Sequence, residues 1–161
     1  QRGHAIECRV YAEDPAGGFL PSTGRLLQFI EPRGPGIRVD AGFRAGDEVT
    51  HFYDPMLAKL IVHAEDREAA IRRMQAALRE FVVHGVTTNI DFMQSLLAHA
   101  DFHNGQVTTR WVETKFGWQA SEPTAEALVA AAIGEMGQKS QVEGQSVEVY
   151  SPWKVESGFR N

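Results

Sequence analysis

The sequence is poor in cysteine and carries no strong excess of positive charge. Its 161 residues include one cysteine, Cys8, so an internal disulfide bond is excluded. The chain has 16 Lys+Arg against 21 Asp+Glu and no basic stripe, and it therefore lacks the electrostatic attraction that nucleic-acid binding requires. We predict no nucleic-acid partner, and a thiol without a disulfide partner favours a reducing, cytoplasmic location.

The sequence also lacks long hydrophobic runs. The most hydrophobic uninterrupted run, residues 128–133, is far shorter than the roughly 20 residues that cross a bilayer. No signal-peptide pattern is found. We expect no membrane association.

Several common catalytic and ligand-binding motifs are missing. The chain contains neither a Gly-x-x-x-x-Gly-Lys phosphate loop nor a Ser-His-Asp signature. His99 and His103 have the i, i+4 spacing of a helix, but a zinc site needs three or four ligands, so we predict no metal site. Gly17 and Gly18 are interpreted as a turn, because no helix follows them to bind phosphate.

What the sequence does contain is a clear alternating strand at residues 4–11. One face is apolar and the other polar: Ile6, Cys8 and Val10 against Glu7, Arg9 and Tyr11. Cys8 therefore has a packing role. Arg9 stands among carboxylates and has a planar, permanently charged fork that suits an oxyanion, carbonyl or carboxylate. On side-chain chemistry alone, a surface ion pair is the favoured explanation of Arg9, because structural arginines outnumber catalytic ones.

The rest of the pattern predicts an α+β fold. Strands are expected at residues 25–30, 37–40 and 56–63, and the Pro- and Gly-rich residues 31–36 make the first two hairpin-like. Asp66 is expected to cap a helix with apolar positions up to Phe81, in a segment closed by Gly85. Further helices are expected at residues 90–98, started by Thr88 and Asn89, and near 109–116. The prediction is a mainly antiparallel sheet flanked by helices.

Four segments carry a family resemblance. Residues 3–15, 19–24, 53–61 and 85–91 read GHAIECRVYAEDP, FLPSTG, YDPMLAKLI and GVTTNID. In this order they closely resemble the C-terminal domain of biotin carboxylase, as found in the biotin-carrying subunit of acyl-CoA carboxylases. The resemblance implies a ligase that uses MgATP and bicarbonate to carboxylate the ureido nitrogen of the cofactor biotin. It assigns Arg9 of the Glu-Cys-Arg motif to the biotin ureido oxygen.

Neighbouring residues are candidates for supporting roles. Asp54 could orient Arg9 if the strands are adjacent, Glu7 shares the face of Arg9, and Tyr53 either supports the site or packs. Lys59 is interpreted as a solvated side chain on the sheet. Arg38 matches an arginine of the family's dimer interface, where Pro35 replaces an aromatic residue of some relatives.

The chain is predicted to have three parts. Residues 1–116 form the biotin carboxylase C-terminal domain, residues 117–146 a helix over 125–136 with a polar linker, and residues 147–161 a tail or the start of a following domain. The ATP-binding domains would precede Gln1 and the biotin attachment motif would follow Asn161. We therefore expect a fragment that is inactive when isolated.

The resemblance also implies partners and leaves alternatives. The expected partners are the upstream ATP-grasp domains, the biotin carrier domain and the carboxyltransferase subunit. A non-catalytic subunit-assembly module, in which Arg9 is structural, is the alternative from another class. Within catalysis, a part of pyruvate or urea carboxylase shares the same motifs, and the acyl-CoA substrate is not determined by this sequence.

Overall fold

A computed structural model describes residues 2–120 and 122–142 of the chain, with side chains described up to residue 133. The tail expected at residues 147–161 lies outside the described residues. The chain divides into two compact units, Gln1–Ala120 and Ser121–Asn161. No helix in the described residues is long and apolar enough to cross a membrane.

The first unit contains short strands and four helices. The strands are β1 (His4–Tyr11), β2 (Glu13–Asp14), β3 (Leu20–Pro21), β4 (Gly24–Arg25), β5 (Gln28–Ile30), β6 (Ile37–Ala41), β7 (Glu48–Val49), β8 (Met56–Ala64) and β9 (Val82–His84). The helices are α1 (Arg67–Glu80), α2 (Ile90–Ala98), α3 (Ala100–His103) and α4 (Trp111–Thr114).

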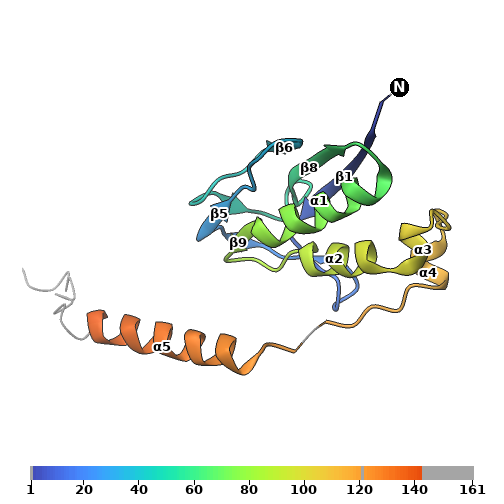
Figure 1. The fold of residues 1–161 in the computed structure, drawn as a ribbon. Coiled ribbons are helices and arrows are strands. Elements are labelled where there is room, and N and C mark those ends of the chain that lie inside the picture. The colour runs from blue at the N-terminus through green and yellow to red at the C-terminus, as the bar shows by residue number, and fades with distance from the viewer. Residues whose placement is uncertain (1, 121, 143–161) are drawn as a thin grey trace, which may run out of the picture. The chain divides into compact units, whose positions relative to one another are not determined.

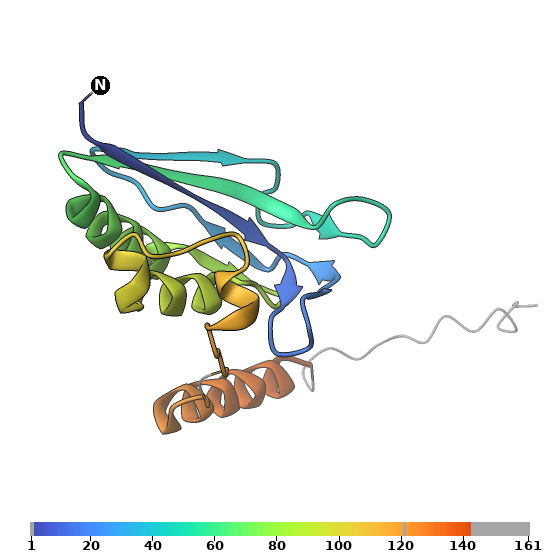
Figure 2. The same ribbon diagram turned by 90° about the vertical axis from the view of Figure 1, so that its right-hand side faces the viewer.

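The main sheet has three strands in the order β1-β8-β6, and both pairs are antiparallel. Helices α1 and α2 pack against one face of this sheet (Figures 1 and 2). Two-stranded ladders join β2 to β3, β4 to β7 and β5 to β9. The expected α+β class, with antiparallel strands covered by helices, is confirmed.

The core lies between the sheet and its helices. Apolar side chains that alternate along β1 and β8 meet the apolar stripes of α1 and α2, and burial of this surface provides the main stabilisation. The largest fully buried side chains of the unit are Leu26, Leu57, Leu60, Ile71, Met74, Leu78, Leu97, Val10, Val49 and Val62.

Helix α1 begins as predicted and ends earlier than expected. The Asp66 carboxylate accepts a hydrogen bond from the Ala69 N–H at 2.8 Å, which caps the helix. Phe81 is already extended, with φ −78° and ψ 110°. Residues 82–84 then form β9, so Gly85 follows a strand and does not close the helix. The β-branched Val82 and Val83 favour that strand.

Two other expectations were wrong. Residues 25–30 and 37–40 do not form a hairpin: β5 pairs with β9, and β6 pairs with β8. The Pro- and Gly-rich connection turns the chain, and the apolar strands β9 and β8 complete the two ladders. In the second unit, helix α5 (Ala125–Val142) continues through residues 137–142, which were expected to be linker. Gln138, Lys139 and Gln141 in this stretch are strong helix formers.

Candidate functional site

The outward face of the main sheet carries the charged residues singled out by the sequence. The antiparallel register sets Arg9 opposite Lys59, and Lys59 opposite Asp40, so the three side chains share one face. We call this set the charged face: Glu7, Arg9 and Tyr11 on β1, Lys59 on β8, and Arg38 and Asp40 on β6. Because the core lies on the opposite face, these groups remain accessible to a ligand.

The Arg9 guanidinium is held by a residue of its own strand. Its Nε donates a hydrogen bond to Glu7 Oε1 at 3.1 Å, and the Arg9 side chain is 57% exposed. This hydrogen bond raises the pKa of Arg9, and the Tyr11 side chain raises it further. Glu7 engages the Nε alone, and the two terminal amino groups of Arg9 form no ion pair with a carboxylate in the described residues. They can bind an oxygen of a ligand.

A second pair of charges lies across the sheet from Arg9. Arg38 donates two hydrogen bonds to the Asp40 carboxylate, at 2.9 and 2.8 Å. These bonds, with a further contribution from Lys59, lower the pKa of Asp40. Lys59 itself forms no ion pair among the residues that the structure describes, so its ammonium stands between the two arginine–carboxylate pairs.

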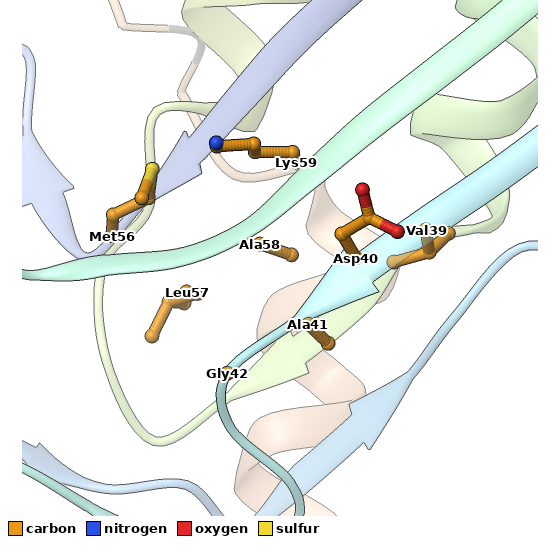
Figure 3. Close-up of a pocket in the computed structure, with 8 residues that line it drawn as sticks. All are labelled: Val39, Asp40, Ala41, Gly42, Met56, Leu57, Ala58 and Lys59. Atoms are coloured by element: carbon orange, nitrogen blue, oxygen red, sulfur yellow. The ribbon is translucent and has the colours of Figure 1, made fainter.

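A shallow hollow lies where β6 ends and β8 begins. Its volume is about 540 Å³, and both polar and apolar side chains line it. Figure 3 shows Lys59 and Asp40 directed to one side of these strands, while Leu57 and Ala41 point to the other. The polar groups of the hollow thus belong to the charged face, which gives that face a concave edge.

The structure does not bring the Asp54 carboxylate to Arg9. β1 and β8 are neighbours, as the pairing idea required, but Asp54 lies before β8 and its Oδ1 accepts a hydrogen bond from the Met56 N–H at 2.8 Å. Its charge acts on Glu13 instead: burial first, and then Asp54, raise the pKa of Glu13. Tyr53 is 84% exposed beside Asp54 and does not pack into the core.

The four sequence motifs meet at the carboxyl end of β1. The Ala12 N–H donates to Pro55 O at 2.9 Å, and Ala12 O accepts from the Ser22 N–H at 2.8 Å. Ser22 Oγ accepts from the Thr87 N–H at 3.0 Å. Segments far apart in the sequence are therefore tied to the strand that carries Arg9, which explains why the motifs occur together.

A family model now identifies the fold. The model described as "Biotin carboxylase C-terminal domain" matches residues 7–114, about two thirds of the chain. The chain belongs to the biotin carboxylase C-terminal domain family. The family assignment predicted from the motifs is therefore confirmed.

Curated relatives of this biotin carboxylase domain are acyl-CoA carboxylase subunits. The chain is 42% identical over 139 residues to the mitochondrial propionyl-CoA carboxylase alpha chain of Caenorhabditis briggsae, covering 80% of this chain and 19% of the relative. It is 40% identical over 164 residues to the mitochondrial methylcrotonoyl-CoA carboxylase subunit alpha of Dictyostelium discoideum, covering 98% of this chain and 23% of the relative. The chain thus spans about a fifth of the length of these relatives.

A solved structure has the same fold. It is the biotin carboxylase domain dimer of Hydrogenobacter thermophilus 2-oxoglutarate carboxylase, in complex with MgADP, ADP and bicarbonate. The TM-score is 0.70 at 40% sequence identity, and the match covers 74% of this chain and 27% of that chain. The domain therefore occurs in carboxylases of both acyl-CoA and keto-acid type.

Sequence reasoning missed the contact between Asn89 and the strand that carries Arg9. It correctly assigned Asn89 to the start of a helix, since Asn89 is the N-cap residue of α2. The Asn89 side chain, however, hydrogen bonds to the backbone of β1 on both sides of Val10. The available signal was its place in the fourth motif, residues 85–91. Its spatial partner could not be identified because 78 residues separate Asn89 from Tyr11.

Two other sequence interpretations can be placed in the structure. Cys8 is partly buried on the core side of β1, and its burial raises the pKa of the thiol to about 12, which suits a packing role. Within the described residues, no group of three or more His, Cys, Asp or Glu side chains is placed to hold a metal ion. His99 instead accepts a hydrogen bond from the Asp101 N–H and stacks edge-on against Trp111.

Proposed function

We propose that this domain forms the C-terminal part of a biotin carboxylase, which carboxylates the ureido nitrogen of biotin with MgATP and bicarbonate. This would be the first half-reaction of an acyl-CoA carboxylase. The observation that carries the proposal is Arg9: it projects from β1 on the charged face, keeps its terminal amino groups unpaired with any described carboxylate, and belongs to the family's Glu-Cys-Arg motif.

The residues present fit a ureido oxygen at this place. When bound, biotin supplies the nitrogen that accepts the carboxyl group, and loss of its proton puts negative charge on the ureido oxygen. The Arg9 guanidinium would stabilise that charge, because its hydrogen bond to Glu7 already orients the donors before the ligand binds. Lysine would supply the charge without the planar fork. An arginine guanidinium stays charged throughout the working pH range.

We assign supporting roles to three neighbours. Glu7 orients Arg9 through the 3.1 Å hydrogen bond. Asp54 shapes the turn into β8 through its bond to the Met56 N–H, and its neighbour Tyr53 is exposed. Tyr53 would then contact biotin or the domain that delivers it, since an exposed aromatic side chain gains most by burial in a contact.

The partners belong to the same proposal. The domain would receive activated bicarbonate from the ATP-grasp domains of its subunit and biotin from a carrier domain. The carboxylated biotin would then pass to a carboxyltransferase subunit. The alignment with the methylcrotonoyl-CoA carboxylase subunit includes the residues after 116, which supports an acyl-CoA carboxylase over pyruvate or urea carboxylase. A cytoplasmic location stays a prediction, since the names of both relatives place them in mitochondria.

The test is the carboxylation of free biotin by a full-length subunit that contains this chain. We expect Arg9→Ala to lower kcat about a hundredfold to a thousandfold, because one preorganised donor to a developing charge is lost. Arg9→Lys should lose less. The matched control is Arg72→Ala: Arg72 is 59% exposed and also ion-paired, to Glu68 on α1, but it lies outside the charged face. Full activity of Arg9→Ala would refute the proposal.

The isolated chain provides a second test. We expect it to show neither bicarbonate-dependent ATP hydrolysis nor biotin carboxylation, and we expect both to return when the ATP-grasp part of the subunit is added. The competing function, a subunit-assembly module, is favoured by Arg38 and Asp40 on β6, whose outer edge has no partner strand in the described residues. Assembly without Arg9-dependent turnover would support that alternative.

A further inference from the structure

The strand that carries Arg9 is fixed from its outer edge by one side chain. The Asn89 Nδ2 donates a hydrogen bond to the Arg9 carbonyl oxygen at 3.1 Å, and Asn89 Oδ1 accepts one from the Tyr11 N–H at 3.0 Å. The Asn89 N–H also donates to Tyr11 O at 3.2 Å. Asn89 thus satisfies the backbone groups that a further strand would otherwise pair.

Asn89 does not cap its own helix with its side chain. It stands at the N-cap of α2, where an asparagine side chain normally accepts a hydrogen bond from the first turn of the helix. The Asn89 side chain makes no such capping bond, although Asp66, the N-cap residue of α1, does. The Asn89 amide instead hydrogen bonds to β1, some 80 residues away in the sequence.

The location is buried and leaves little freedom. Asn89 is 8% exposed, and among the residues that the structure describes it is the only buried residue with a polar side chain. The β1–β8 register shifts between Val10 and Tyr11, so the ladder is irregular at the place where Asn89 binds. Two edges therefore hold the Arg9 backbone: β8 on one side and the Asn89 amide on the other. Loss of the amide would leave the Arg9 carbonyl and the Tyr11 N–H unpaired.

From this arrangement we infer that Asn89 is a positioning residue for Arg9: its amide fixes the β1 backbone so that the guanidinium presents its terminal donors in one geometry. The inference rests on the proposed function of Arg9. Asn89 does not touch the ligand site, and it acts only through the strand. Misplacement of a catalytic group by about 1 Å can cost on the order of a hundredfold in rate, so its removal should be visible in turnover.

The first experiment measures the contact itself in the 161-residue chain. In Asn89→Ala, hydrogen exchange of the Tyr11 amide should become at least about tenfold faster, because its acceptor is removed. The control is Asp66→Ala, which deletes a helix-start carboxylate that makes no contact with β1. There the Tyr11 amide should exchange at the original rate. Unchanged exchange in Asn89→Ala would overturn the inference.

The second experiment measures turnover in the full-length subunit. Asn89→Ala should lower kcat for biotin carboxylation about tenfold to a hundredfold, with the KM for ATP unchanged, whereas Asp66→Ala should keep the original kcat. In an Arg9→Ala background, Asn89→Ala should add less than about a twofold loss, because its effect passes through Arg9. Losses that multiply would mean a general structural role and would overturn the inference.

A conservative variant guards against a folding defect, and the outcomes separate the two proposals. Asn89→Asp keeps the acceptor for the Tyr11 N–H and loses the donor to the Arg9 carbonyl, so it should retain Tyr11 protection and show an intermediate kcat. If Arg9→Ala loses turnover and both Asn89 variants do not, only the positioning inference fails. If Arg9→Ala keeps full turnover, the proposed function fails, and the role of Asn89 fails with it.

Discussion

At Arg9, the neighbours on the same strand decide how the guanidinium is held. Residues two apart on a strand share a face, so Glu7 and Tyr11 flank Arg9 on β1. The exposed ion pair contributes little to folding, because exposed charges attract one another weakly in water. Its effect is on orientation, and orientation is what a preorganised donor requires.

Glu7 should therefore affect turnover more than stability. We expect Glu7→Ala to lower kcat for biotin carboxylation several-fold with an unchanged melting temperature, since only the orientation of Arg9 is lost. Glu7→Gln keeps an oxygen acceptor and should recover most of the activity. Steady-state kinetics and thermal unfolding of the two variants check this. A large drop in the melting temperature of Glu7→Ala would contradict the assignment.

The buried thiol of Cys8, next to Arg9, should make the free energy of unfolding fall at alkaline pH. Burial raises the pKa of its thiol from 9.0 to about 12, so above pH 9 the folded chain keeps a proton that the unfolded chain releases. This stabilisation is complete below pH 9 and is lost as pH rises toward 12, by at most about 1.4 kcal/mol per pH unit. Urea unfolding between about pH 8 and pH 10.5 should show this slope, and Cys8→Ala should lack it. Equal slopes would show that the thiol is not desolvated.

At the scale of elements, one glycine permits the β5–β9 ladder to form. Gly85 has φ +108°, and a Cβ there would collide with the backbone oxygen of Arg25. Gly18 also has a positive φ, +77°, but an added Cβ there meets nothing within 4 Å. The two positions therefore separate backbone strain from steric collision.

Alanine substitutions at these glycines should differ clearly. We expect Gly18→Ala to cost about 1 kcal/mol of unfolding free energy, from the left-handed backbone alone. Gly85→Ala should cost about 3 kcal/mol, because it adds the collision with the neighbouring strand. Chemical denaturation measures both. Equal costs would mean that the Arg25 backbone moves aside readily and that the chain next to the β5–β9 ladder is not tightly held.

At the scale of the whole molecule, the first unit contains a complete core. The hydrophobic cluster runs from Val10 to Leu97, and the aromatic contacts among Phe92, Phe116 and Trp118 close it near the end of the unit. Unit 2 is described by helix α5, in which Thr124 caps the first turn by accepting a hydrogen bond from the Ala127 N–H at 3.3 Å. Folding of the first unit should therefore be independent of residues 121–161.

Truncation tests this division. A chain that ends at Ala120 should unfold cooperatively with the same melting temperature as the 161-residue chain, because no part of its core is removed. A truncation inside the unit, before Trp111, should lower the melting temperature, because Trp111 is buried and its Nε1 donates to Asp101 at 2.9 Å. Loss of cooperativity in the Ala120 chain would refute the boundary.

Local pattern was sufficient for some elements and insufficient for others. The alternation around Arg9 correctly predicted β1 and its two faces, and the Asp66 cap correctly predicted the start of α1. The hairpin between residues 25–30 and 37–40 was wrong, because strand pairing depends on which apolar edge is available and not on the nearest turn. The β9 strand was missed because three residues between a helix and a glycine give too short a signal.

The same limit applies to the site. Arg9, Glu7 and Tyr11 lie within one strand, so their common face follows from the spacing of side chains along an extended backbone. The turn-forming role of Asp54 and the neighbours of Lys59 depend on register, which no single strand specifies.

The family, the α+β class and the outward direction of Arg9 follow from the order of residues alone, because motifs and side-chain periodicity are local properties of the chain. Three other features required the folded chain: the place of β8 between β1 and β6, the bond of Asp54 to the Met56 N–H, and the reach of the Asn89 amide to the Arg9 backbone. These contacts join residues dozens of positions apart, and they form where packing of the shared core brings strand edges together.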